Sequence, residues 1–178
     1  MMLNSQTIEK LKDMKLNAMA KALAEQLKNP EIGSISFDDR FGMLVDEQWS
    51  SRRTNRIVNL IQKAKFKFPD ACIENIDYAP DRKLDRELIA SIADGRYIRE
   101  KNNVIIMGAA GTGKSFMGCA FGIMACRQLK RVRYIRLPEL LEDMNIARCT
   151  GNDGFRRLVV EYKKYDVLIL DEWLHRPL

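Results

Sequence analysis

The sequence predicts an α/β fold in which helices flank a parallel sheet, preceded by a small all-helical N-terminal domain. Two observations support this fold class. Apolar residues recur at three- and four-residue steps through the first third of the chain, which is the spacing of a helix face. Further along, strand-like runs at 104–107, 132–136 and 167–170 alternate with helix-compatible segments. Such alternation is typical of βαβ units with parallel strands.

Composition restricts the class of protein. The chain has 178 residues, a formal net charge of +6, 46% hydrophobic and 30% charged residues. These values belong to a folded globular protein and exclude disordered, collagen-like and disulfide-scaffold classes. No run approaches the roughly 20 apolar residues of a membrane span, and the N-terminus lacks the apolar stretch of a signal peptide. We therefore expect a cytoplasmic protein.

The cysteines and the single histidine do not have the spacing of a zinc site. Cys72, Cys119, Cys126 and Cys149 form no C-x-x-C pair, whereas structural zinc sites draw on closely spaced Cys and His ligands. We expect buried, reduced thiols. His175, near the end of the chain, is interpreted as an ordinary surface residue.

Two helices are predicted in the N-terminal domain. The first carries an apolar stripe from Ile8 onward and is expected to end at Pro30 and Gly33, because both residues disfavour helix. The second begins after Ser36, since Asp39 stands three residues on in the capping-box position. The apolar residues of this second helix can share one broad face.

A basic segment lies on the second helix and just beyond it. Residues 51–67 contain 6 basic and no acidic side chains, a surplus equal to the +6 of the whole chain. One interpretation is a solvated helix face, but such faces usually mix charges of both signs. The other is contact with a polyanion. The candidate contact residues are Arg52, Arg53, Arg56, Lys63, Lys65 and Lys67.

The predicted domain limits are 1–68 for the helical domain, 69–83 for a linker and 84–178 for the sheet-bearing domain. Pro69 and the irregular stretch after it mark the linker. In chain order, the elements expected after the linker are a helix at about 85–99, a strand at 104–107, a helix at 114–129, a strand at 132–136, a helix around 139–148, a loop at 150–154, a helix at 155–163 and a strand at 167–170.

The segment GAAGTGKS, from Gly108 to Ser115, fits the phosphate-loop pattern G-x4-G-K-[ST] in full. Its glycines let backbone N–H groups surround a phosphate at the start of the following helix. Lys114 would lie between the β- and γ-phosphates, and the Ser115 hydroxyl would bind Mg²⁺. The alternative, a Gly-rich turn without function, would not require the predicted context of strand, loop and helix.

An acidic pair, Asp171 and Glu172, follows the last predicted strand. The carboxyl ends of parallel strands form the ligand edge of such a sheet. Asp171 would hold Mg²⁺, and Glu172 would orient and deprotonate an attacking water. An acidic strand end is common by itself, so this interpretation depends on the phosphate loop upstream.

Five successive segments carry a family resemblance: RRTNRIVNLIQKAKF, ENIDYAPDRKLDRELI, NVIIMGAAGTGKSFMGCA, VRYIRLPELLEDMNIA and YDVLILDEW. From about residue 5 to its end, the chain resembles the IstB family, the ATP-binding helper proteins of bacterial insertion sequences. That family is similar to the DnaC-type helicase loaders and belongs to the AAA+ ATPases.

The resemblance implies a helical DNA-binding domain followed by a P-loop AAA+ ATPase domain. Such a protein would assemble on double-stranded DNA with ATP and Mg²⁺ as a homo-oligomer, and would help the transposase of the same element to select or engage target DNA. Asp171 and Glu172 take the place of the family's acidic pair, and Lys114 and Glu172 are the expected catalytic residues. The implied nucleotide contacts are Gly108, Gly111, Thr112, Gly113, Lys114 and Ser115.

The resemblance also implies a sensor strand and an arginine finger after the acidic pair, and the chain stops at Leu178. We therefore expect a truncated AAA+ core in which the strands at 104–107 and 167–170 have unpaired edges. ATP binding is then expected, and ATP hydrolysis is left open. Two alternatives remain: a DnaC-type replicative helicase loader, and a truncated, non-enzymatic DNA-binding fragment.

Overall fold

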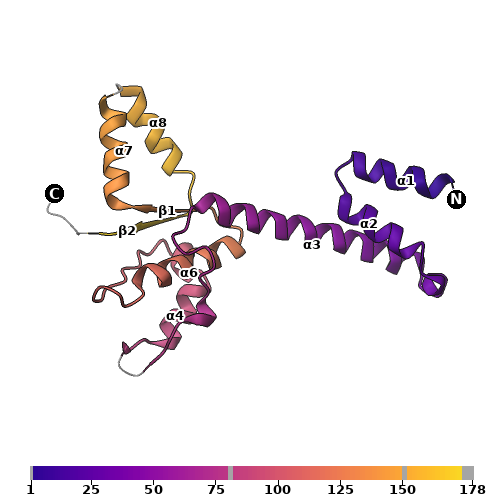
Figure 1. Cartoon of the computed structure of the whole chain (residues 1–178), viewed down its shortest axis with the longest axis horizontal. Helices are drawn as coiled ribbons and strands as arrows, with labels where there is room; N and C mark the ends of the chain where they lie inside the picture. The colour runs from indigo at the N-terminus through magenta and orange to yellow at the C-terminus, as the bar shows by residue number, and fades with distance from the viewer. Residues whose placement is uncertain (1, 80–81, 150–151, 174–178) are drawn as a thin grey trace. The chain divides into compact units, whose positions relative to one another are not determined.

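The computed structural model describes residues 2–79, 82–149 and 152–173. Its internal contacts divide the chain into two compact units, Met1–Arg56 and Ile57–Leu178, and each unit is described by itself (Figure 1). Helix α3 (Phe37–Ala64) contributes residues to both units. Residues 150 and 151 of the predicted loop, and His175, lie outside the described residues.

The first unit is helical, as predicted. Before α3 it contains α1 (Met2–Asp13), α2 (Asn17–Gln26) and the short 3-10 helix η1 (Pro30–Ser34). The prediction of one helix up to Pro30 is wrong, because the chain turns between α1 and α2. Lys15 adopts a left-handed backbone with φ 59°, and the Leu16 N–H donates to the Leu11 carbonyl at 2.8 Å. This bond ends α1 in the manner of a Schellman motif.

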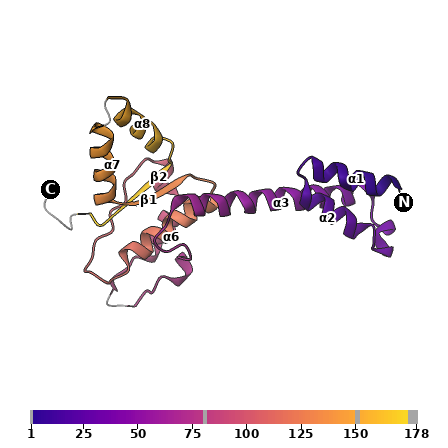
Figure 2. The ribbon, with the colours of Figure 1, turned by 45° about the horizontal axis from the view of Figure 1, so that its top comes forward.

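Two hydrogen bonds join α2 to α3 inside the first unit. The Met19 N–H donates to Gln48 Oε1 at 3.2 Å, and Gln26 Nε2 donates to the Arg40 carbonyl at 3.1 Å. Figure 2 shows α1 and α2 beside the first part of α3. The buried apolar residues of the described part of this unit are Leu11, Ala20 and Leu44.

Helix α3 begins where the sequence predicts. Ser36 Oγ accepts the Asp39 N–H at 3.2 Å and donates to Asp39 Oδ2 at 2.6 Å, so the expected cap is formed. In the first half of this helix, the apolar residues that can share one face are not all buried. Phe37 is 68% and Trp49 62% exposed, because α2 contacts only part of the apolar circumference.

The second unit contains a parallel sheet of two strands. Its described elements are η2 (Ile73–Asn75), α4 (Arg86–Ala93), α5 (Arg96–Arg99), α6 (Lys114–Arg127), β1 (Val132–Arg136), α7 (Leu137–Cys149), α8 (Asn152–Tyr162) and β2 (Val167–Asp171). In the register of this sheet, Val132 lies opposite Val167 and Arg136 opposite Asp171. Helices α7 and α8 lie on one side of the strands and α6 on the other (Figure 1, Figure 2).

These elements confirm the α/β class and most of the predicted helices and strands. The helix expected at 85–99 is divided in two at Gly95, whose φ of 74° requires a left-handed backbone. Helix α8 begins earlier than predicted, at Asn152. The β1 and β2 boundaries agree with the predicted strands to within one residue.

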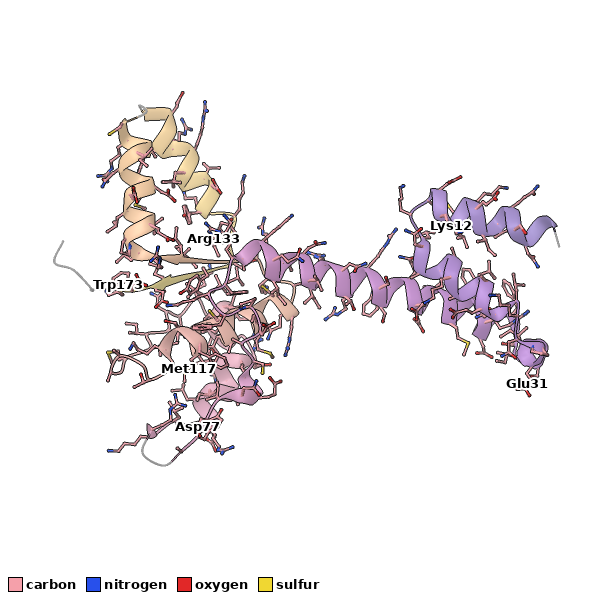
Figure 3. The ribbon with its side chains drawn as sticks, viewed as in Figure 1. Lys12, Glu31, Asp77, Met117, Arg133 and Trp173 are labelled. Carbon is pink, nitrogen blue, oxygen red and sulfur yellow. The ribbon has the colours of Figure 1, made fainter. Side chains whose placement is uncertain are left out.

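Helix α6 lies at the centre of the second unit's core. Cys119, Ala120 and Cys126 on this helix are fully buried, and Met117, labelled in Figure 3, is buried with Ile89 in an adjoining cluster. Phe66 and Tyr134 pack into the main cluster. A helix buried on nearly all sides explains why the apolar residues of α6 do not form a single stripe.

Gly122 on α6 provides a test of this packing. A Cβ at this position would lie 2.5 Å from Phe66 Cε1 and 2.7 Å from Ile169 Cδ1. We expect Gly122→Val to destabilise the protein by about 1–3 kcal/mol through overpacking, measured as the midpoint of urea unfolding. The matched control is Gly42→Val on α3, because nothing lies within 4 Å of the corresponding Cβ. Equal midpoints for both variants would contradict the packing described.

The strand predicted at Val104–Met107 is not formed. Ile105 is 80% and Met107 86% exposed, and the only sheet among the described residues pairs β1 with β2. A strand exists only by hydrogen bonding to a neighbour. The described residues supply no strand to pair with this segment, and Leu168 on β2 is itself exposed.

The cysteines are free, as predicted. The expectation that all of them are buried is wrong for Cys149, which is exposed, and for Cys72, which is only partly buried, whereas Cys119 and Cys126 are buried. Burial raises the pKa of the Cys126 thiol to about 11, which keeps it protonated and unreactive. Among the described helices, none combines the length and apolar character needed to cross a membrane.

Candidate nucleotide-binding site

The Gly-rich loop leads directly into α6. Gly111 and Gly113 have φ of 78° and 83°, a conformation that favours glycine, and Gly113 is the residue that caps the helix. The turn therefore presents the first N–H groups of α6 toward the loop. Such groups, at the positive end of the helix dipole, favour a bound phosphate.

Lys114 folds back over this loop. Its Nζ donates to the Ala109 carbonyl at 2.6 Å, and Thr112 Oγ1 donates to the same carbonyl at 2.8 Å. The ammonium is thus held at the loop by a neutral acceptor. A phosphate oxygen, which forms stronger charge-assisted bonds, can replace that carbonyl.

Arg82 is a loop contact that the sequence analysis missed. Its Nη2 donates to the Thr112 carbonyl at 2.8 Å, and its Nη1 donates to the Asp77 carbonyl at 2.7 Å. The guanidinium also lies 3.6 Å from the place where a Cβ on Gly113 would stand. Arg82 belongs to the segment DYAPDRK, which was interpreted as a linker, and only the fold brings it to the loop.

Replacing Arg82 with Ala tests this contact. Loss of the two hydrogen bonds and one nearby positive charge is expected to weaken ATP binding roughly tenfold, or about 1.4 kcal/mol. Isothermal titration of the full chain with ATP measures the effect. Lys83→Ala removes the same charge one residue later and should leave the affinity within about twofold. Equal losses in both variants would mean that general charge, rather than the Arg82 contacts, supports the loop.

The two residues expected to hold Mg²⁺ lie near each other. Ser115, in the first turn of α6, is close enough to the Asp171 carboxylate at the end of β2 to help lower its pKa. Tyr134 on β1 also donates its hydroxyl to Asp171 Oδ2, and the Glu172 N–H donates to Asp171 Oδ1 at 2.9 Å. Burial raises the pKa of Asp171, but these hydrogen bonds outweigh it and the net pKa is lowered. Asp171 is therefore an anion at neutral pH.

These oxygens suit Mg²⁺, which prefers carboxylate and hydroxyl ligands and completes its octahedron with water and substrate phosphates. A site of this kind does not need three protein ligands. No group of three or more His, Cys, Asp or Glu side chains arranged to hold a metal occurs in the part of the chain that the structure describes.

Glu172 is paired with a base that the sequence analysis also missed. Arg136 Nη1 lies 3.8 Å from Glu172 Oε2, and Arg136 Nε donates to Glu139 Oε1 at 2.8 Å. Arg136 lies opposite Asp171 in the sheet, so parallel pairing of β1 and β2 brings the base to the acidic pair. The spacing of Arg136 and Glu172 along the sequence does not indicate this contact.

Lys65 and Lys67 lie near the acidic pair. Together with Arg136 and Glu172 they line a cavity of about 430 Å³, and the charge of Lys67 contributes to the lowered pKa of Asp171. Both lysines are exposed. Their position favours a role beside the acidic pair as much as a contact with a polyanion.

The other basic candidates lie on α3. Arg52, Arg53 and Arg56 belong to the first unit and Lys63 to the second, and all four are exposed. Within the described residues, no ion pair involves any of them. The Arg53 guanidinium lies 5.5 Å from the centroid of the exposed Trp49 ring. Exposed bases without acidic partners are suited to an external anion.

Comparison with known proteins gives a family match over most of the chain. Residues 9–178 match the family model described as IstB-like ATP binding protein. An ATP-binding protein of insertion sequence IS1162 from Pseudomonas fluorescens is 41% identical over 172 residues, which cover 97% of this chain and 74% of that protein. An insertion sequence ATP-binding protein of Sinorhizobium fredii is 36% identical over 177 residues, covering 99% of this chain and 71% of the relative.

Proposed function

The chain belongs to the IstB-like ATP-binding proteins, and from this premise we propose that it is an ATP-dependent regulator of DNA transposition. It assembles on double-stranded DNA with ATP as a homo-oligomer and helps the transposase of the same element to engage target DNA. The observation that carries the proposal is the Gly-rich turn into α6, over which Lys114 Nζ folds back to the Ala109 carbonyl at 2.6 Å. ATP and DNA as ligands favour a cytoplasmic location.

In this proposal the nucleotide binds at the start of α6. Backbone N–H groups from Gly108 to Gly113 and the Lys114 ammonium hold the phosphates. Ser115 and Asp171 hold Mg²⁺, which supplies neutralisation of phosphate charge when bound. Lys114 exchanges the Ala109 carbonyl for phosphate oxygens, so nucleotide binding changes the hydrogen bonding of the loop itself.

Hydrolysis, where it occurs, depends on Glu172. A carboxylate at this place can orient a water toward the terminal phosphate and accept its proton. Arg136 competes for that carboxylate at 3.8 Å. We propose that the protein binds ATP firmly and turns it over slowly while this ion pair persists.

The proposed DNA-binding region is the helical domain, residues 1–68. A linker at 69–83 and the ATPase domain at 84–178 follow it. Six basic side chains between residues 51 and 67 contact backbone phosphates rather than base edges. Contacts of this kind position a protein on DNA with little sequence discrimination. They also make the affinity strongly dependent on salt.

The decisive experiment measures DNA binding of the full chain with and without ATP and Mg²⁺ in a filter-binding titration. We expect tighter binding with nucleotide, together with larger assemblies in sedimentation. An unchanged affinity would contradict the ATP-dependent assembly. A parallel pull-down against the transposase and against a replicative helicase distinguishes this function from that of a helicase loader, because each function predicts capture of only one of the two partners.

A further inference from the structure

Tyr134, in the middle of β1, is a buried residue whose hydroxyl lies at the candidate site. The residue is 7% exposed, and its hydroxyl donates to Asp171 Oδ2 at the end of β2. We propose that Tyr134 is a positioning residue, whose hydroxyl holds the Asp171 carboxylate in the orientation that nucleotide-bound Mg²⁺ requires. The inference rests on the ATP-binding part of the proposed function and adds to it a residue outside both nucleotide motifs.

The parallel sheet brings the two side chains to one face. In its register Tyr134 lies opposite Ile169, two residues before Asp171. Because side chains alternate between the two faces of a strand, Ile169 and Asp171 share a face. Ile169 is directed toward α6, since a Cβ on Gly118 would lie 3.6 Å from its Cγ2. The hydroxyl therefore reaches the carboxylate on the side of the sheet that is covered by the helix following the phosphate loop.

Core packing fixes the ring of Tyr134. The ring belongs to the main cluster of the second unit, together with Phe66 after the end of α3 and with Cys119 and Ala120 on α6. A hydroxyl on a ring enclosed in this way needs an acceptor inside the protein. The Asp171 carboxylate is such an acceptor, so the packing of the sheet sets the position of the carboxylate expected to hold Mg²⁺.

The Asp171 carboxylate is held at both of its oxygens. Oδ2 accepts from the Tyr134 hydroxyl, and Oδ1 accepts the Glu172 N–H at 2.9 Å. Donors at both oxygens restrict rotation about the χ2 torsion, which is otherwise broad for an aspartate. An ionised carboxylate accepts about four hydrogen bonds, so lone pairs remain for Mg²⁺ or for the waters around it. Ser115, the other expected ligand, lies near the same carboxylate.

A positioning role and a purely structural role predict different results for the loss of this hydroxyl. Hydrogen-bond partners of metal ligands orient those ligands, and their removal typically lowers metal affinity about 10- to 100-fold. Tyr134 also lines the cavity of about 430 Å³ beside the acidic pair, together with Glu172. A hydroxyl that only supported the sheet would contribute to stability and leave metal affinity unchanged.

The test compares the ATP affinity of Tyr134→Phe and of the wild type, with Mg²⁺ and with EDTA, by isothermal titration of the full chain. Phenylalanine keeps the packed ring and removes only the hydroxyl. With Mg²⁺ present, we expect the variant to bind ATP about tenfold more weakly, at the lower end of the range for lost partners of metal ligands. In EDTA the two proteins should agree within about twofold, because the phosphate loop is intact.

A second comparison shows whether Tyr134 acts through Asp171. Asp171→Asn removes the charged ligand, so adding Tyr134→Phe to this variant should cause no further loss of Mg²⁺-dependent affinity. Residues that act through one another give such non-additive effects, whereas the effects of independent residues add. A further loss of about tenfold in the Asn background would contradict the inference.

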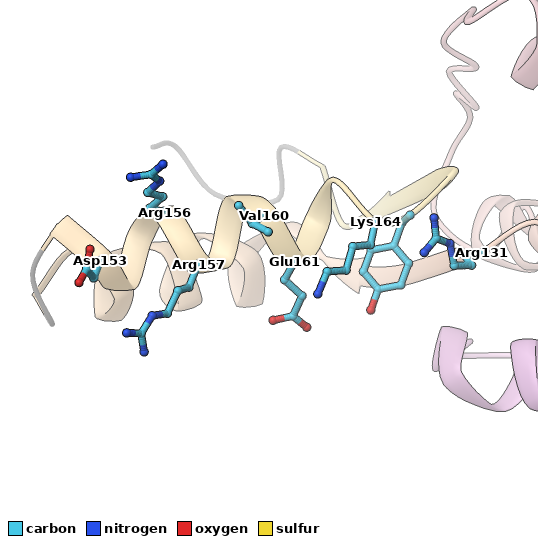
Figure 4. Close-up of a pocket in the computed structure, with 8 residues that line it drawn as sticks. Arg131, Asp153, Arg156, Arg157, Val160, Glu161 and Lys164 are labelled. Carbon is cyan, nitrogen blue, oxygen red and sulfur yellow. The ribbon is translucent and has the colours of Figure 1, made fainter.

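The matched control is Tyr165→Phe. Tyr165 lines an open groove along α8, whose side chains are drawn in Figure 4, and it is not among the residues that line the cavity beside the acidic pair. The control loses the same hydroxyl within the same unit and should keep both wild-type affinities. If circular dichroism shows that Tyr134→Phe is not folded, Tyr134→Met replaces it with the same result expected, because methionine fills irregular core space.

Two other results would overturn the role of Tyr134. One is a Phe variant with the Mg²⁺ dependence of the wild type, and the other is an equal loss of affinity with Mg²⁺ and with EDTA. A wild-type chain that does not bind ATP overturns both this inference and the ATP-binding part of the proposed function. A wild-type chain that binds ATP with Mg²⁺ but does not bind DNA overturns only the proposed regulation of transposition.

Discussion

Replacing Lys114 with Ala is expected to weaken ATP binding roughly 30- to 150-fold. The ammonium now donates to the Ala109 carbonyl and would donate to phosphate oxygens when ATP is bound. A hydrogen bond between two charged groups contributes about 2–3 kcal/mol, which converts to that range of affinities. Isothermal titration of the full chain with ATP and Mg²⁺ measures the loss.

The control for this variant is Lys101→Ala. Lys101 is exposed and carries the same charge as Lys114, but it lies outside the phosphate loop. Its replacement should leave ATP affinity unchanged. The Lys114 variant should also lose the ATP stimulation of DNA binding while keeping its affinity for DNA without nucleotide. Retention of both ATP affinity and stimulation would contradict the assignment of the loop as the nucleotide site.

Reversing the charge of Arg52 and Arg56 on α3 is expected to weaken DNA binding about 60-fold at 0.1 M salt. Each lost phosphate contact reduces the log–log slope by about 0.9, so two contacts change it by roughly 1.8. If the wild type and the variant bind DNA equally at 1 M salt, a slope difference of roughly 1.8 corresponds to an affinity difference of about 60-fold at 0.1 M salt. The slope is measured by anisotropy titrations at salt concentrations from about 0.05 to about 0.3 M.

The loss should be similar for every duplex sequence tested, because phosphate contacts carry no direct sequence information. Lys28→Glu with Lys101→Glu is the matched control for charge, because both lysines are exposed and belong to none of the ion pairs among the described residues. A selective loss for one sequence would mean that these arginines reach base edges. An unchanged slope would mean that the basic segment 51–67 is an ordinary solvated surface.

Local patterns in the sequence were sufficient for the elements that depend on near neighbours. The Ser36 cap, the start of α6 at Lys114 and the two strands β1 and β2 all lie where the sequence predicts. Caps and Gly-rich turns are determined within a few residues of the chain, whereas the apolar runs of β1 and β2 form strands because each pairs with the other. The break at Lys15 was missed because the apolar spacing continues across it.

The candidate site was only partly predictable for the same reason. The sequence shows GAAGTGKS and the acidic pair as motifs, but the approach of Ser115 to Asp171 depends on how α6 packs against the sheet. Arg136 reaches Glu172 only because β1 and β2 are parallel and in register. Arg82 reaches the loop from thirty residues away.

By itself, therefore, the sequence determined the α/β class, the phosphate loop and the concentration of positive charge between residues 51 and 67. The tertiary structure decided which side chains surround the loop and that the segment Val104–Met107 does not form a strand. The physical reason is the separation along the chain between the residues that interact. Helix caps and turns depend on neighbours along the chain, whereas strand pairing and side-chain contacts depend on partners that only folding brings together.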